Sequence, residues 1–174
     1  MKGLVRLAPY DPGWPARFSL LAARVRTALS DRALLLEHVG STSVPGLCAK
    51  PVIDMILAVA DSADEAAYVP SLEAHGFRLR IREKDWFEHR LLECSEIEAN
   101  LHVFSKGCPE IDRVLAFRDW LRVNEEDRRL YEDTKRALAV RRWTQVQDYA
   151  DAKSDVVRTI LGRALAATRR DSAR

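Results

Sequence analysis

Apolar residues recur at helical and at strand spacings in separate parts of the chain. Between residues 15 and 29 they lie three and four positions apart, as in an amphipathic helix, and Pro15 suits its first turn. Residues 33–39 form a short apolar run that predicts a strand. The most apolar stretch, residues 51–60, is rich in β-branched residues and too short for a buried helix. It predicts a central strand that carries one charge, Asp54.

The remaining pattern divides the chain into a sheet-rich part and a helical part. Residues 62–75 predict a helix that Pro70 interrupts and Gly76 ends. Further strands are expected at 77–82, 86–93 and 99–104, and helices at about 110–123, 126–142 and 146–168. We therefore expect an α/β (α+β) fold with one domain over residues 1–168. Its sheet-rich half is 1–108, its helical half is 109–168, and a polar tail at 169–174 is expected to fray.

Composition and charge exclude several classes of protein. Hydrophobic residues make up 47% and charged residues 31%, a balance typical of soluble globular proteins. The net charge of +2 and the lack of a basic run with interleaved aromatics disfavour nucleic-acid binding. The three cysteines, Cys48, Cys94 and Cys108, form no CxxC pair, so reduced thiols are expected. No leader or membrane span is indicated, and we expect a cytoplasmic protein.

A glycine–serine turn follows the first predicted strand. Gly40 lets the backbone approach a ligand closely, and Ser41, Thr42 and Ser43 add hydroxyl groups beside exposed N–H groups. Such a turn can cradle an anion. It can equally be an ordinary turn with no ligand, and the turn alone does not decide between the two.

Asp54 is a lone carboxylate inside an apolar strand. Its burial is costly unless it is hydrogen-bonded, paired with a cation or bound to a metal. One interpretation is a structural aspartate that is hydrogen-bonded to the backbone or forms a salt bridge to a neighbouring arginine. The other is a carboxylate at the end of a strand that faces the same crevice as the Gly40–Ser41 turn and holds Mg²⁺, a cation that prefers carboxylate and phosphate oxygens.

The spacing from the Gly-Ser turn to this aspartate resembles the motif of the nucleotidyltransferase superfamily. More narrowly, the chain resembles the GrpB family over about residues 3–165. The matching segments are HVGSTSVPGL at 38–47, AKPVID at 49–54, NLHVF at 100–104, FRDWLR at 117–122, Tyr131, Lys135, and YADAK at 149–153. The resemblance implies a nucleotidyltransferase-like mixed β-sheet flanked by helices, with a nucleotide as ligand and Mg²⁺ as cofactor. Some family members are joined to dephospho-CoA kinase in one chain, which hints at coenzyme A.

This sequence departs from the superfamily pattern at the metal site. The resemblance implies two acidic residues separated by one position and a third on a neighbouring strand, which together hold two Mg²⁺ ions. Asp54 matches the first position, but Ile56 occupies the second, and the strand expected to carry the third offers Asn100 and His102. A two-metal site is therefore doubtful, whereas one Mg²⁺ held by Asp54 and phosphate oxygens fits the residues.

Three cations lie on or beside the apolar stripes of the predicted C-terminal helices: Arg118, Lys135 and Lys153. They could extend to solvent or pair with a buried aspartate. They could instead converge with Lys50 on the crevice and neutralise phosphates. His102 is the histidine that we expect to line the site as a catalytic residue.

These features leave three functions open. The first is a nucleotidyltransferase that acts on a small molecule, with phosphates held by Gly40, Ser41, Thr42 and Ser43 and by the cations named above. The second is a nucleotide- or coenzyme-A-binding module without turnover, which the isoleucine at position 56 favours. The third is a protein-interaction domain whose basic helices contact an acidic partner. Membrane association is not expected.

Overall fold

The computed structural model describes residues 5–173 and contains one five-stranded mixed sheet. The strands are β1 (Leu35–Val39), β2 (Ile53–Val59), β3 (Phe77–Glu83), β4 (His89–Cys94) and β5 (Ala99–Ser105). Their order in the sheet is β1-β2-β5-β4-β3. The pair β2–β5 is parallel, and the other three pairs are antiparallel. The expected α/β fold is confirmed.

Strand β2 lies inside the sheet and is covered on both faces. Ile53, Met55 and Leu57 pack into the larger core cluster. Ile56 and Ala58 pack into a second cluster on the opposite face. Burial on both faces explains why this strand is a nearly continuous apolar run rather than an alternating one. Asp54 lies on the second face, near the start of β2, where the apolar covering ends.

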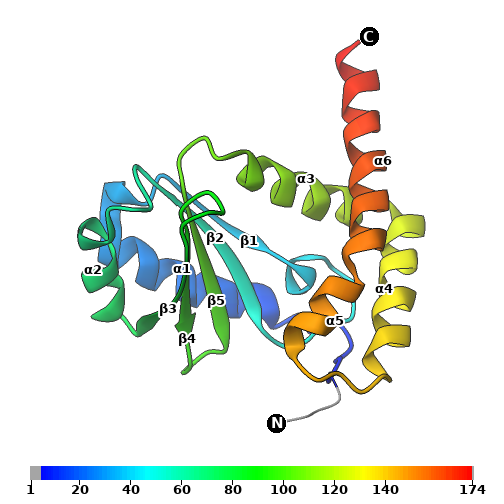
Figure 1. The fold of residues 1–174 in the computed structure, drawn as a ribbon, viewed down its shortest axis with the longest axis horizontal. Coiled ribbons are helices and arrows are strands. Elements are labelled where there is room, and N and C mark those ends of the chain that lie inside the picture. The colour runs from blue at the N-terminus through cyan, green and yellow to red at the C-terminus, as the bar shows by residue number, and fades with distance from the viewer. Residues whose placement is uncertain (1–4, 174) are drawn as a thin grey trace.

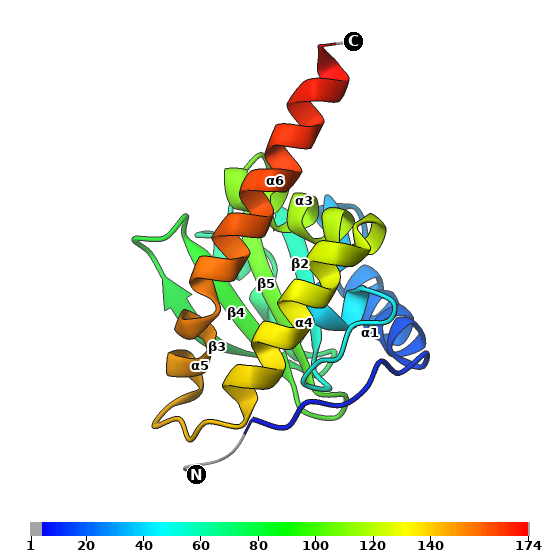
Figure 2. The same ribbon diagram turned by 90° about the vertical axis from the view of Figure 1, so that its right-hand side faces the viewer.

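Six α-helices surround the sheet: α1 (Trp14–Leu29), α2 (Val69–Glu73), α3 (Pro109–Val123), α4 (Glu125–Ala139), α5 (Val146–Ala152) and α6 (Ser154–Ser172). Helices α1 and α2 lie on one side of the sheet (Figure 1) and contribute to the larger core. Helix α3 packs on the other side, and α4, α5 and α6 gather near it (Figure 2). Because these helices leave much of β3, β4 and β5 uncovered, the second face of the sheet is partly open.

Local signals fix where several helices begin. The Asp11 carboxylate accepts a hydrogen bond from the Gly13 N–H at 2.7 Å just before α1. Asn124 caps α4 by accepting from the Asp127 N–H at 2.9 Å. Pro109 occupies the first turn of α3. These short-range contacts explain why the pattern predicted the starts of α1, α3 and α4 within one or two residues.

The structure differs from four expectations. Residues 62–75 form only a 3-10 turn and the five-residue α2, because Pro70 limits the helix to one short segment. Residues 86–88, the expected start of the strand at 86–93, belong instead to the turn before β4. The helix expected at 146–168 is divided at Lys153 into α5 and α6. The tail expected to fray from residue 169 continues α6 to Ser172, whose hydroxyl donates to the Thr168 carbonyl at 3.0 Å.

No helix within residues 5–173 combines the length and the apolar character that a membrane crossing requires.

Candidate functional site

The Gly40 backbone lies directly against the Asp54 side chain. Val39 pairs with Asp54 across β1 and β2, so Gly40 leaves the sheet immediately beside the carboxylate. Gly40 has φ 71° and ψ −176°, a conformation that is essentially restricted to glycine. A Cβ atom at this position would lie 2.7 Å from Asp54 Oδ2. The Gly40 backbone therefore lies so close to the Asp54 carboxylate that a side chain on residue 40 would not fit.

Within residues 5–173, Asp54 is neither sealed in the interior nor paired with an arginine. Its side chain is 34% exposed, and the Asn100 amide of β5 donates to Oδ1 at 3.1 Å. His102, two residues along β5, places Nε2 3.7 Å from the same oxygen. The carboxylate therefore keeps acceptor capacity for a ligand or a cation, and the salt-bridge interpretation does not describe it.

Lys135 of α4 joins the Gly-Ser turn to the following loop. Its ammonium group donates to Ser41 Oγ at 3.0 Å and to the Cys48 carbonyl oxygen. It also lies 4.9 Å from the centre of the Tyr131 ring. The Lys135 side chain is buried, and this burial lowers its pKa to about 8. Among the described residues no carboxylate pairs directly with Lys135, so this ammonium group is available to neutralise an anion at Ser41.

The side chains of Lys153 and Tyr149, at the end of α5, lie near Asp54 and Ser41. The Lys153 ammonium group lies 4.6 Å from the centre of the Tyr149 ring. Burial lowers the pKa of Lys153, and the negative charge of Asp54 partly offsets that effect. Tyr149 is only 2% exposed, yet its hydroxyl has no hydrogen-bond partner within residues 5–173. A buried hydroxyl without a partner is costly, so it marks a position where a polar ligand atom would fit.

These groups enclose a cavity of about 170 Å³. It is lined by Leu7, Ser41, Thr42, Ala49, Lys50, Val52, Asp54, Asn100, Lys135, Tyr149, Ala150 and Lys153. Three lysines and one aspartate give the lining an excess of positive charge. The composition of the lining therefore favours an anion that carries several charges, such as a chain of phosphates.

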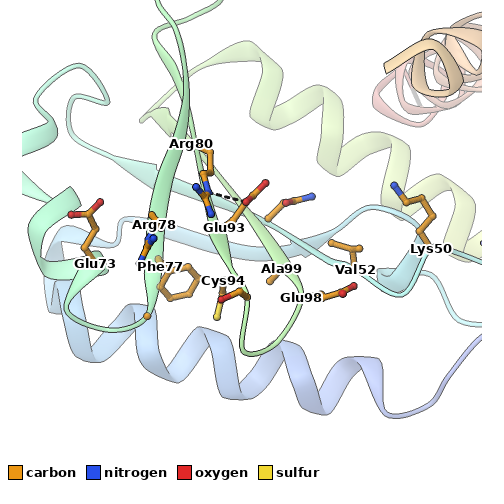
Figure 3. Close-up of a pocket in the computed structure, with 13 residues that line it drawn as sticks. Lys50, Val52, Glu73, Phe77, Arg78, Arg80, Glu93, Cys94, Glu98 and Ala99 are labelled. Carbon is orange, nitrogen blue, oxygen red and sulfur yellow. Dashed lines mark hydrogen bonds and ion pairs between the residues drawn. The ribbon is translucent and has the colours of Figure 1, made fainter. Parts of the chain in front are cut away.

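A larger groove of about 820 Å³ continues from this cavity. The two share Lys50, Val52 and Asn100 in their linings. Figure 3 shows Lys50 at one end of the groove and Glu73 at the other, with the Arg80–Glu93 ion pair between them. The groove is large enough for a nucleotide-sized molecule, whereas the cavity holds only its charged end.

Three of the predicted phosphate-binding residues are directed elsewhere. The Ser43 hydroxyl donates to the Gly40 carbonyl at 2.5 Å. Thr42 borders the cavity, but its hydroxyl is bonded to His38 Nε2 at 2.9 Å. Arg118 donates to Glu37, Asp119 and the His38 carbonyl, and it borders a separate apolar cavity behind Ser41. Arg118 therefore supports β1 and is not among the residues that line the cavity beside Asp54.

The metal-ligating atoms around Asp54 could hold one hard cation only if a bound ligand supplied further oxygen atoms. Within residues 5–173, no group of three or more His, Cys, Asp and Glu side chains is placed to hold a metal ion. Ile56 at the second acidic position is buried under α3. Mg²⁺ commonly binds through one or two carboxylates together with substrate phosphates and water. Asp54 and phosphates in the cavity would supply such a set for one ion but not for two.

Tyr149 and the Cys48 carbonyl are the site groups to which the sequence analysis gave no role in binding. Tyr149 lies four residues before Lys153 on the same helical stripe, and this spacing is a local signal that could have indicated it. The Cys48 carbonyl has no such signal, because a backbone atom in a loop leaves no mark in the residue pattern.

Removal of the Tyr149 hydroxyl should have opposite effects on protein stability and on pyrophosphate binding. Tyr149→Phe is expected to leave the unliganded protein equally stable or about 1 kcal/mol more stable, because it removes a buried group without a partner. The same change should weaken pyrophosphate binding about tenfold or more, because a hydrogen bond to a charged group is lost. Thermal unfolding with and without pyrophosphate measures both effects. Tyr131→Phe is the matched control: it removes a hydroxyl that is bonded to Ser41 and should lower stability.

Comparisons with known proteins agree over nearly the whole chain. A family model described as GrpB protein matches residues 4–163. A UPF0157 protein of Halalkalibacterium halodurans is 59% identical over 160 residues, which are 92% of this chain and 82% of that protein. A crystal structure of GrpB from Enterococcus faecalis superposes with a TM-score of 0.83 at 29% identity, covering 94% of this chain and 99% of that one. A protein named dephospho-CoA kinase in Mycolicibacterium paratuberculosis is 31% identical over 186 residues, which cover 92% of this chain but 46% of that longer protein.

Proposed function

Because this chain belongs to the GrpB family, we propose that it binds a nucleoside triphosphate and transfers the nucleotidyl group to a small-molecule acceptor. One observation carries the proposal. Three lysines and Tyr149, whose buried hydroxyl has no hydrogen-bond partner within residues 5–173, line a cavity that also contains Asp54 and Ser41. This combination of charges and donors suits a polyphosphate better than a neutral or singly charged ligand.

The dimensions of the two hollows suggest how such a ligand lies. The 170 Å³ cavity accommodates phosphate groups, held by Ser41, Lys50, Lys135, Lys153 and Tyr149. The 820 Å³ groove accommodates the sugar and base or the acceptor. Phosphates placed between the lysines would bring the reacting phosphorus close to Asp54, where the two hollows meet at Asn100.

The residues of the site can each be given a task in the transfer. Lys135 and Lys153 neutralise the charge that develops on the departing pyrophosphate. Ser41 and Tyr149 orient the phosphates by hydrogen bonds. Asp54 would hold one Mg²⁺ jointly with phosphate oxygens, and this ion would supply additional stabilisation of negative charge.

Asp54→Ala tests the proposal directly. We expect wild type to bind a nucleoside triphosphate in the presence of Mg²⁺, and Asp54→Ala to lose most of the Mg²⁺-dependent part of that affinity. Isothermal titration with a panel of triphosphates measures this. Glu125→Ala is the control, since this exposed carboxylate of α4 pairs with Arg129 and lines neither the cavity nor the groove. No binding by wild type, or equal binding by Asp54→Ala, would contradict the proposal.

A second candidate is a module that binds a nucleotide or coenzyme A without turnover. It is favoured by the buried Ile56, which leaves only one carboxylate at the site. The relatives named dephospho-CoA kinase supply a second, weaker argument for a coenzyme A context. Release of pyrophosphate, or an acceptor that carries a nucleotidyl group, would eliminate this candidate; binding without either product would support it.

The location of the protein and its protein partners stay predictions of the sequence. We propose a cytoplasmic protein with reduced thiols, in keeping with Cys48, Cys94 and Cys108, which are all buried and unpaired with one another.

A further inference from the structure

Four side chains form a line across the open face of the sheet and end at the candidate site. The exposed Glu83 Oε2 lies 2.7 Å from His89 Nδ1. His89 Nε2 lies 3.0 Å from His102 Nδ1. His102 Nε2 lies 3.7 Å from Asp54 Oδ1. The line crosses β3, β4, β5 and β2, so it joins solvent at one sheet edge to the cavity near the other.

The first carboxylate sets the direction of the hydrogen bonds. An ionised carboxylate only accepts, so His89 must carry its proton on Nδ1. Burial, followed by the effect of the neighbouring His102, lowers the pKa of His89 and keeps its ring neutral. A neutral imidazole has one proton, so His89 Nε2 is an acceptor. His102 Nδ1 must therefore be the donor in the contact between the two rings.

This direction determines what His102 presents to the site. With its proton on Nδ1, a neutral His102 has a lone pair on Nε2, which faces the Asp54 carboxylate. Two acceptors do not form a hydrogen bond, and the 3.7 Å separation is longer than one. Asp54 Oδ1 receives its hydrogen bond from Asn100 instead. Asp54 Oδ1 and His102 Nε2 can consequently accept a proton that a ligand brings into the space between them.

The turn between β3 and β4 holds His89 in this position. Trp86 packs edge-on against the His89 ring, with centroids 4.9 Å apart, and Phe104 lies 4.9 Å from it on another side. Phe87 and Glu88 have positive φ angles of 54° and 51°, which are uncommon for residues other than glycine. Figure 1 shows this turn at the end of the β3–β4 hairpin. The turn therefore positions the buried His89 ring against Trp86 and Phe104.

We infer that Glu83 and His89 are positioning residues that fix the tautomer of His102, so that its Nε2 takes the proton of the attacking nucleophile. The inference rests on the proposed function and specifies the acceptor as a hydroxyl or amine. The acceptor atom forms a bond to the α-phosphorus with its lone pair. The bond from that phosphorus to the bridging oxygen breaks, pyrophosphate leaves with the bonding electrons, and the acceptor proton moves to His102 Nε2. The resulting imidazolium is stabilised by Asp54.

Nitrogen-15 NMR of the imidazole rings tests the tautomer without any substrate. The chain has four histidines, so each ring can be assigned from single variants. We expect His102 in the wild type to be protonated on Nδ1 and not on Nε2. In His89→Phe, Nδ1 loses its acceptor, and the proton should move to Nε2, where the Asp54 carboxylate accepts it. Wild-type His102 protonated on Nε2, or an unchanged His102 in His89→Phe, would overturn the inference.

Glu83→Ala gives the same test without a change in the interior. Glu83 is half-exposed, so this variant should fold normally. His89 then loses the acceptor for its Nδ1 proton, and a population of His102 protonated on Nε2 should appear. Asp85→Ala removes another exposed carboxylate in the same turn and should leave the His102 signals unchanged. Identical His102 signals in Glu83→Ala and the wild type would count against the role of Glu83.

Nucleotide measurements separate this inference from the proposed function. If triphosphates bind, His89→Phe should retain wild-type affinity while pyrophosphate release falls by up to about 10²-fold. Unchanged release would refute the role in proton transfer although binding stands. If no triphosphate binds, the proposed function fails, whereas the NMR result still decides the direction of the hydrogen bonds.

Discussion

Gly40→Ala is expected to lower the stability of the protein and to abolish nucleotide binding together. The backbone at this position, with φ 71° and ψ −176°, costs a residue with a side chain about 1–3 kcal/mol. The added methyl group would also lie 2.7 Å from Asp54 Oδ2 and 3.0 Å from Asp54 Cβ, so either the turn or the carboxylate must move. Urea unfolding and isothermal titration with a triphosphate measure the two effects.

Gly46→Ala is the matched control for this prediction. Gly46 lies in the same loop and also has a positive φ, of 82°, but an added Cβ would meet nothing within 4 Å. This variant should lose stability only through backbone strain and should still bind the triphosphate. A second control, Gly40→Ala with Asp54→Ala, should recover part of the stability but none of the Mg²⁺-dependent binding. If Gly40→Ala binds as tightly as Gly46→Ala, the close approach of the turn to Asp54 has no role in binding.

Lys135→Met should weaken the binding of pyrophosphate by about 10- to 100-fold. Lys135 donates to Ser41 and to the Cys48 carbonyl, so it supplies both charge to the cavity and order to the turn. Hydrogen bonds to charged groups contribute about 1.5–3 kcal/mol, and 1.4 kcal/mol corresponds to a factor of ten in affinity. Titration of pyrophosphate at pH 7, where Lys135 is still protonated, measures the loss. Equal affinity would remove Lys135 from the proposed site.

The same variant has a pH-dependent effect on stability. The pKa of Lys135 is lowered from 10.5 to about 8 in the folded protein. Between these values the unfolded chain binds the proton and the folded protein does not, so the Lys135 contribution to stability rises with pH from about 8 to 10.5. The wild type should therefore gain about 1–3 kcal/mol relative to Lys135→Met across this range. Buried tyrosines with raised pKa values act in the opposite direction but are present in both proteins.

Lys106→Met provides the baseline for that comparison. Lys106 is exposed after β5, so its replacement removes an ammonium group that is not buried in the folded protein. Denaturant unfolding at several pH values compares the three proteins. A difference between wild type and Lys135→Met that stays constant from pH 7 to pH 10 would show that burial of this ammonium group is not costly in the native state.

The spacing of apolar residues within short segments was enough to predict most of the secondary structure. The period of apolar residues placed α1, β1, β2, β3 and β5 within about two residues of their bounds. One of the errors falls where tertiary contacts outweigh local preference. Trp86 and Phe87 are aromatic and typical of a strand, but packing of Trp86 against His89 and Phe104 places them in the turn before β4.

The candidate site divides in the same way. Gly40, Ser41 and Asp54 were predictable, because a short loop joins the two strands that carry them and their spacing resembles a known motif. Arg118 was predicted with the same reasoning as Lys135, since both are cations on apolar stripes. Only the fold shows that α3 directs Arg118 to Glu37, while α4 directs Lys135 to Ser41.

The sequence by itself therefore determined the fold class, the Gly40–Ser41 turn and the Asp54 carboxylate beside it. These features depend on the period of apolar residues, on the conformational freedom of glycine and on spacing within a few tens of residues. The tertiary structure decided which distant groups share the site. Lys153 and Tyr149 are about a hundred residues from Ser41 along the chain, and the line from Glu83 to His102 crosses three strands. Such contacts arise from packing and strand order, which a linear pattern does not encode.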